Sequence, residues 1–207
     1  MIKSKIIVIV CSLMLMIVSS VFAAEGVYVS GNIGASILND SDLTNPALPG
    51  VVVETGFDTG LLVSGALGVQ VGKGRVEAEI GYRTADIDSF QALGVSASGD
   101  GDASALSFMV NAYLDIKTES AITPYLGGGL GMAKIELDNV SVSGIAIGNE
   151  DDTVFAYQFG GGIGYAMSEK ATLDLGYRYF ATEDLNLSGT DANYGSHNLT
   201  IGIRFGL

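Results

Sequence analysis

The sequence predicts an all-β fold: an eight-stranded antiparallel up-and-down transmembrane β-barrel with long outer loops and short periplasmic turns. First, apolar side chains alternate with small or polar ones in about eight segments after residue 25, which is the period of a β-strand. Second, the connections between these segments are alternately long and short. Third, charged residues make up only 16% of the chain and mean hydropathy is +0.40, yet no later stretch could form a spanning helix. Hydrophobicity divided among many short segments is typical of membrane barrels, because only every second residue must face lipid.

Residues 1–23 have the layout of a cleaved signal peptide, which leaves residues 24–207 as one barrel domain. Lys3 and Lys5 precede an apolar run over 6–18, and small residues lead to Ala23. This run is shorter than the roughly 20 residues that a spanning helix needs. The one cysteine of the chain lies within this segment, so we expect the mature protein to have neither a disulfide nor a thiol nucleophile.

The first three expected strands are Val27–Leu38, Gly60–Val71 and Arg75–Ala85. The polar stretch between the first two contains two prolines and predicts a long loop. The second and third are separated only by Gly72-Lys73-Gly74, where glycine can adopt the positive φ that a tight hairpin turn requires.

Five further strands follow with the same alternation. Long polar connections precede the first, third and fifth of them, and short turns precede the other two. The predicted ranges are Ala103–Ile116, Thr123–Leu137, Val154–Ala166, Thr172–Phe180 and His197–Leu207. With the N-terminus entering from the periplasm, an even number of strands places all long connections outside.

Periodicity alone leaves open which face lines the interior. A soluble secreted barrel of the lipocalin type would turn its apolar face inward around a ligand. The polar face here consists mainly of Gly, Ser, Ala and Asn rather than the Lys and Glu that keep an exposed sheet soluble. Small side chains fit the interior of an eight-stranded barrel, which side chains can only just fill. We therefore expect the apolar face to contact lipid.

With lipid outside, several charged side chains point into the lumen. Buried charges persist only when they are paired and hydrogen-bonded. We expect these residues to form a structural network of salt bridges that plugs the barrel, although the wet ends of the barrel would also accommodate some of them. This predicted lumen network consists of Glu77, Glu79, Arg83, Asp115, Asp174, Arg178 and Arg204.

The formal net charge is −13, and most of the 23 acidic residues lie in or beside the long connections. An acidic rim repels polyanions, which argues against nucleic-acid binding. Asp100 and Asp102, or Glu150, Asp151 and Asp152, offer oxygen ligands for divalent cations, but solvated loop charge is the favoured explanation of these residues. We therefore assign no metal site and no cofactor.

The single histidine, His197, shares the lipid-facing side of the last strand with Leu199. A barrel hydrolase resembling the lipid A deacylases would need a serine two residues away on that face. Gly195 and Leu199 occupy those positions, and Ser196 points to the other side. A Ser-His-acid set is thus not assembled locally, and we expect no enzymatic activity.

The chain resembles the outer-membrane β-barrel superfamily that includes OmpA transmembrane domains, OmpX-like proteins, opacity-type proteins and bacterial surface antigens. This resemblance implies a structural, adhesive or antigenic surface protein of the bacterial outer membrane, with a narrow porin-like channel or a lipid A-modifying enzyme as alternatives. It also implies contact with outer-membrane lipid and lipopolysaccharide, recognition of the C-terminal strand by the barrel-assembly machinery, and a host or extracellular ligand on the loops. The segments that carry it are residues 26–34, 123–131, 173–179 and the closing strand, which ends in Leu207 where an aromatic residue is usual.

Overall fold

A computed structural model describes residues 26–39, 41–44, 52–92, 95–142, 145–187 and 190–207, so the predicted signal peptide lies outside the described residues. In this part of the chain, no helix is long and apolar enough to cross a membrane. The strands are β1 (Val27–Leu38), β2 (Ser41–Thr44), β3 (Val52–Phe57), β4 (Gly60–Val71), β5 (Gly74–Ala92), β6 (Val95–Asp115), β7 (Ile122–Val142), β8 (Ile145–Ala166), β9 (Ala171–Thr182), β10 (Leu185–Leu187), β11 (Thr190–Ala192) and β12 (Gly195–Gly206).

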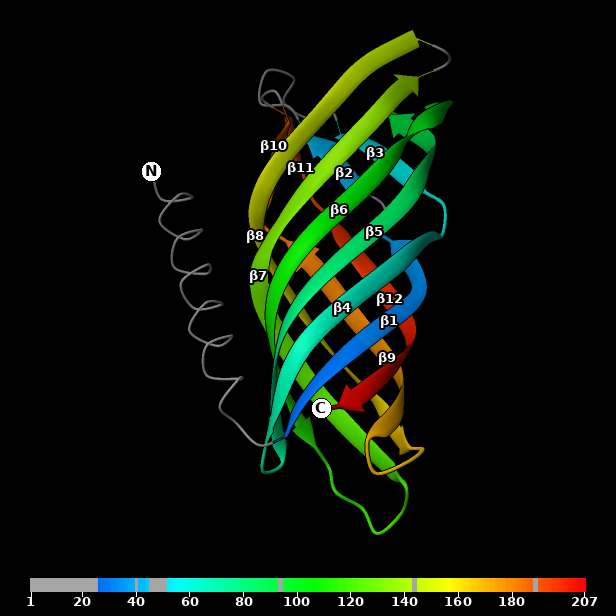
Figure 1. Cartoon of the computed structure of the whole chain (residues 1–207). Helices are drawn as coiled ribbons and strands as arrows, with labels where there is room; N and C mark the ends of the chain where they lie inside the picture. The colour runs from blue at the N-terminus through cyan, green and yellow to red at the C-terminus, as the bar shows by residue number, and fades with distance from the viewer. Residues whose placement is uncertain (1–25, 40, 45–51, 93–94, 143–144, 188–189) are drawn as a thin grey trace, which may run out of the picture.

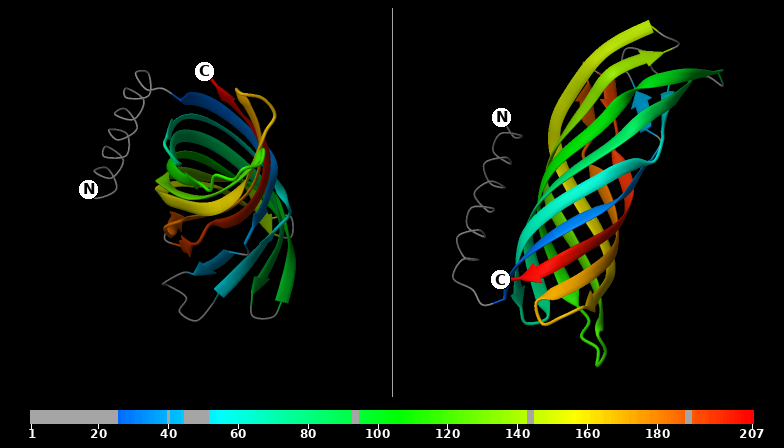
Figure 2. Two further views of the ribbon diagram at one scale, coloured as in Figure 1. Left: turned by 90° about the horizontal axis from the view of Figure 1, so that it is seen from below. Right: turned by 45° about the vertical axis from the view of Figure 1, so that its right-hand side comes forward.

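Eight of these strands close into a barrel. In ring order they are β1, β4, β5, β6, β7, β8, β9 and β12, and each pairs antiparallel with both neighbours. The ring closes between the first and last strands, where Ile33 of β1 lies opposite Ile201 of β12. The closed wall is seen from the side in Figure 1 and from below in Figure 2. The predicted eight-stranded antiparallel barrel is confirmed.

The short connections lie together at the lower end of Figure 1, the end that we expect to face the periplasm. The tightest of them joins β4 to β5 through Gly72 and Lys73, and Gly72 has a φ of 64°. This is the left-handed conformation that glycine adopts at little cost. The C-terminal end of β12 lies at this same end of the barrel.

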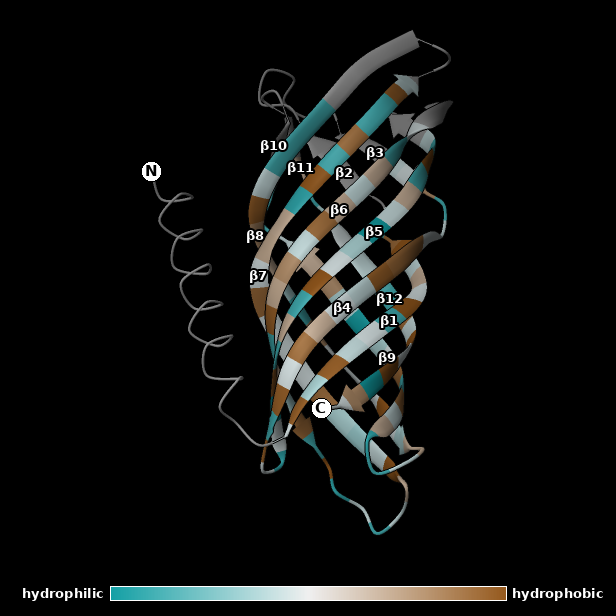
Figure 3. Ribbon diagram, in the orientation of Figure 1, coloured by the Kyte–Doolittle hydropathy of each residue, from teal (hydrophilic) through white to brown (hydrophobic). Residues whose placement is uncertain are grey.

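The strands have an apolar outer face and a small or polar inner face, which appears as alternating bands in Figure 3. On the outer face, about half the surface of Ile33, Ile80 and Leu130 is exposed. On the inner face, Asn111 and Asn198 are fully buried. This arrangement matches a wall that contacts lipid and rules out a lipocalin-like interior.

The strands extend well beyond the ranges that the sequence predicts. β5 runs to Ala92 and β6 begins at Val95, and β7 and β8 are similarly extended; these strands form the tall side of the wall in Figure 1. The first and last long connections contain strands as well, because β3 pairs with the extension of β5, and β2 and β11 pair with each other. Ser, Gly and Asp favour loops by composition, but an existing ladder of hydrogen bonds continues into such sequences when a neighbouring strand offers free backbone groups.

Candidate functional site

The interior of the barrel is the candidate site, because buried polar groups from almost every strand meet there. The structure places the whole predicted lumen network on the inner face. The five side chains Glu77, Glu79, Arg83, Asp115 and Asp174 are buried. The side chains of Arg178 and Arg204 are only 12% and 13% exposed. The closure of the ring determines which of these residues pair.

An ion pair between Arg204 and Asp174 links β12 to β9 near the periplasmic end. The Nη2 and Nε atoms of Arg204 donate to the two carboxylate oxygens at 2.9 and 3.2 Å. This two-pronged geometry suits the planar guanidinium. The Arg204 guanidinium also lies 5.6 Å from the centre of the Tyr28 ring.

Arg75 is a member of the site that the sequence prediction missed. Its Nε atom donates to Asp115 at 2.9 Å and its Nη1 atom to Glu77 at 3.4 Å. The guanidinium lies 4.7 and 4.8 Å from the ring centres of Tyr113 and Tyr125. The sequence could have predicted the inward position of Arg75, because Arg75 and Glu77 are two residues apart on one strand and therefore share a face.

Glu77 and Glu79 carry the network across the barrel. The Tyr28 hydroxyl on β1 donates to Glu77 at 2.7 Å. Glu79 pairs with Arg178 on β9 and accepts a hydrogen bond from Gln158 on β8 at 3.2 Å. In the ring order, three strands separate β5 from β9 in either direction, so the Glu79–Arg178 pair joins opposite sides of the wall.

Two inward glycines on β7 leave the space that these large side chains occupy. A Cβ atom on Gly129 would lie 1.9 Å from the Asn111 side-chain oxygen. A Cβ atom on Gly127 would lie 2.2 Å from the Tyr113 ring. The Asn111 oxygen accepts a hydrogen bond from Gln158 at 2.7 Å, so this space is filled by the network itself. We call this set of inward polar groups the polar layer. Its members are Tyr28, Arg75, Glu77, Glu79, Asn111, Asp115, Gln158, Asp174, Arg178 and Arg204.

Arg83 lies on the outer side of the polar layer and has different surroundings. It donates to the Ser107 hydroxyl at 2.9 Å and lies 4.0 Å from the centre of the Phe180 ring. Among the described residues, no carboxylate forms an ion pair with it. The expected salt bridge of Arg83 is therefore replaced by a hydroxyl and an aromatic face.

Above Arg83, a cluster of buried hydrophobic side chains lies in the outer half of the barrel. Phe180 packs edge-on against Tyr194 with ring centres 6.0 Å apart. We call this cluster the apolar layer. Its buried members are Leu38, Ala85, Ala103, Ala105, Met109, Ala133, Ile135, Val154, Ala156, Phe180, Leu185, Ala192 and Tyr194. The sequence prediction did not identify this second layer, because six of its thirteen members are alanines, which resemble the other small residues of the inner face.

His197 is on the outer face, as predicted, and Ser196 is fully buried on the inner face. The Tyr177 hydroxyl and the Nδ1 atom of His197 are 2.7 Å apart and share a hydrogen bond. The histidine ring also lies 5.0 Å from the ring of Tyr179. His197 thus belongs to an aromatic cluster on the lipid-facing wall.

Several acidic residues near the outer end lie on strands rather than in loops. Asp102 on β6 is opposite Asp86 on β5 and Asp138 on β7, which makes a row of three carboxylates across the wall. Lys134 forms ion pairs with Glu136 and Asp151 on the exposed surface. Within the described residues, no group of three or more His, Cys, Asp or Glu side chains could hold a metal ion.

Comparisons with known proteins agree with this architecture. The chain is 25% identical over 191 residues to the outer membrane protein PagN of Salmonella typhimurium, which covers 80% of this chain and 78% of that protein. It is 27% identical over 109 residues to a Rickettsia prowazekii protein named as a candidate adhesin, covering 48% of this chain and 49% of that protein. An uncharacterized protein of Brucella abortus is 33% identical over 97 residues, 43% of this chain, and the match spans only 34% of that relative's length.

Among solved structures, Neisserial surface protein A superposes with a TM-score of 0.59 at 21% identity, covering 88% of this chain and 98% of that one. This likeness shows the fold. The model of the outer membrane protein beta-barrel domain matches residues 8–205. The chain therefore belongs to the outer membrane protein β-barrel domain family.

Proposed function

We propose that this outer-membrane protein is a closed barrel that presents its acidic outer end as a structural and adhesive surface antigen, rather than a pore. The observation that carries this proposal is the filling of the interior at two levels, by the polar layer and then by the apolar layer. An eight-stranded barrel has an interior that side chains can just fill, so two successive layers leave no continuous path for water.

The polar layer supports closure because its contacts cross the bore. Glu79 and Arg178 approach from opposite strands, and Gln158 bridges Glu79 and Asn111 from a third direction. Such contacts would have to break for a hydrated ion to pass.

The apolar layer supports closure independently. Phe180 and Ile135 are fully buried inside the wall, where a channel would need hydrated side chains. A pore through this layer would have to expose these groups to water, at about 25 cal/mol for each Å² of apolar surface. The outer half therefore resembles the core of a small soluble protein more than a vestibule.

The outer end is the surface left for function. Long strand extensions and short additional strands gather there, and among the described residues Asp86, Asp102 and Glu150 are exposed. The similarity to a named candidate adhesin is consistent with a binding role. A surface of this charge favours a cationic or neutral extracellular ligand over a polyanion. We further propose that the closing strand β12 is the segment that the barrel-assembly machinery recognises.

The test compares the unaltered protein with a variant that has a shortened outer end. The measurement is the binding of whole cells that carry either protein to host cells or matrix proteins. Leu137 on β7 is opposite Glu150 on β8, so residues 138–149 can be replaced by Asn-Gly without changing the register. We expect this variant to insert normally and to lose adhesion. A control variant with Lys117→Ser in a periplasmic turn should adhere like the unaltered protein. Full adhesion by the shortened variant would contradict an adhesive role for this surface.

A further inference from the structure

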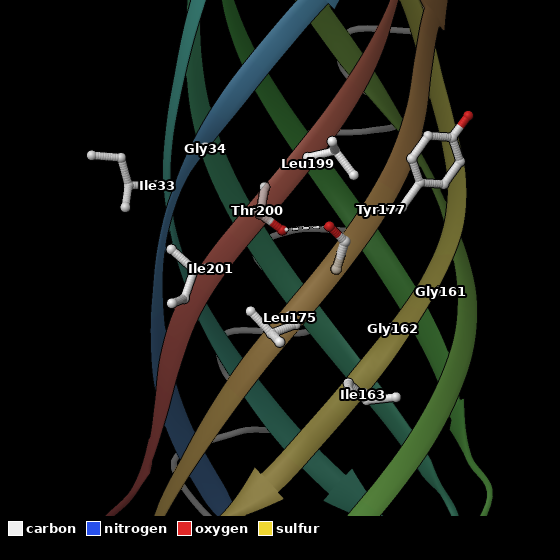
Figure 4. Close-up of a pocket in the computed structure, with 11 residues that line it drawn as sticks. Ile33, Gly34, Gly161, Gly162, Ile163, Leu175, Tyr177, Leu199, Thr200 and Ile201 are labelled. Carbon is white, nitrogen blue, oxygen red and sulfur yellow. Dashed lines mark hydrogen bonds between the residues drawn. The ribbon is translucent and has the colours of Figure 1, made fainter.

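The lipid-facing wall has a groove that the closed interior and the outer surface do not explain. It is an open depression across β1, β12, β9 and β8 with a volume of about 540 Å³. Figure 4 shows it from the membrane side. Gly161 and Gly162 of β8 supply backbone at its floor, and the side chains of Ile163, Leu175 and Ile201 line it.

The groove is apolar, and its surroundings fix what can fill it. Leu175 and Ile201 are 45% and 48% exposed on the outer face. This face belongs to the wall of an outer-membrane barrel, so hydrocarbon covers the groove as it covers the rest of the wall. Gly161 occupies an outward position without a side chain, which leaves a gap between the projecting side chains of Ile163 and Leu175 that one acyl chain can follow.

The outer end of the groove carries a polar pair, which separates it from the rest of the wall. Tyr177 lines the groove, and its hydroxyl shares the 2.7 Å hydrogen bond with Nδ1 of His197. When the tyrosine hydroxyl donates to Nδ1, the neutral imidazole carries its proton on Nε2. The groove then ends at an N–H donor on an otherwise apolar face. In hydrocarbon such a donor gains most from an acceptor oxygen supplied by the lipid.

The position of this donor selects one leaflet. β12 begins at Gly195 at the outer end of the barrel and finishes at Gly206 at the periplasmic end. His197 is two residues from the outer end, whereas Ile201 is at the middle of the strand. A lipid whose oxygens meet His197 and whose chain follows the groove therefore lies in the outer leaflet.

We propose that this groove is a binding site for one acyl chain of an outer-leaflet lipopolysaccharide, with an ester or hydroxyl oxygen of that chain accepting a hydrogen bond from Nε2 of His197. This inference rests on the membrane placement of the wall and does not depend on closure of the lumen or on adhesion.

The test uses native mass spectrometry of the purified protein after incubation in equal amounts of lipopolysaccharide and phosphatidylethanolamine. The unaltered protein should retain one lipopolysaccharide molecule. Leu175→Trp fills the groove and should reduce the retained fraction about tenfold. His197→Phe keeps the ring but removes the donor and should reduce it about fivefold, the value of one hydrogen bond. Tyr177→Phe provides a second variant at the same end of the groove.

The matched control is Ile80→Trp, because Ile80 is 49% exposed on the outer face and does not line the groove. It should retain lipopolysaccharide like the unaltered protein. Equal loss in Ile80→Trp, or no retained lipid in the unaltered protein, would overturn the site. Retention of phosphatidylethanolamine instead would overturn the assignment of the lipid, and a mass of two protein chains would identify the groove as a self-association surface.

Discussion

Removing the Arg178 guanidinium is the sharpest perturbation of the polar layer. In Arg178→Met the Glu79 carboxylate keeps its hydrogen bond from Gln158 but loses its cation. The Glu79 side chain is only 1% exposed, so water cannot replace that cation. A buried ion pair that loses one partner destabilises a protein by about 3–5 kcal/mol. We expect the free energy of unfolding of Arg178→Met to fall by that amount.

The double variant Glu79→Gln with Arg178→Met distinguishes two causes of destabilisation, an unpaired buried charge and a lost packing contact. It removes both charges while an amide oxygen still accepts from Gln158. Replacing both members of a buried pair is often nearly neutral, so the double variant should recover most of the loss. The exposed pair Lys134–Glu136 supplies the control, and Lys134→Met should have a much smaller effect.

The assay is unfolding by urea in lipid vesicles, followed by far-UV circular dichroism because the chain has no tryptophan. Linear extrapolation gives the free energy for each variant. A loss below about 1 kcal/mol in Arg178→Met, or a double variant as unstable as the single one, would refute the reasoning that this pair is dehydrated and spans the bore.

Three other predictions concern separate parts of the wall and interior. Gly129→Ala forces a Cβ against Asn111 and should destabilise the barrel by about 1–3 kcal/mol in the same urea assay, whereas Gly31→Ala, with no atom within 4 Å, should be tolerated. Asp102→Asn relieves repulsion between carboxylates directly opposite each other and should stabilise the barrel by about 0.2–1 kcal/mol at low salt; a gain that does not shrink in 1 M salt would contradict this cause. Phe180→Ala removes the largest apolar side chain of the apolar layer and should cost about 3–5 kcal/mol, so an unchanged midpoint would show that this layer is not packed.

The period-two pattern was enough to predict the barrel and the inward side of the charges. Once alternate residues are divided between two faces, Glu77 and Glu79 have to share the inner face with Arg83. Arg75 obeys the same rule and is the first residue of the predicted strand Arg75–Ala85, yet the predicted network omitted it.

The partners of these charges could not be predicted in the same way. That Glu79 meets Arg178 depends on the number of strands between β5 and β9 and on the stagger of the whole wall. The outer extensions were missed for a related reason. Asp86 and Asp102 occur in Ser- and Gly-rich sequence that predicts loops, and only the neighbouring ladder makes strands of them.

Conductance of the purified barrel in a planar lipid bilayer tests the central claim most directly. A lumen closed by the polar and apolar layers predicts a membrane that stays at its background conductance, with no steady open level over the recorded voltage range. Large, steady, porin-like steps from the unaltered protein would contradict the account and would favour a channel.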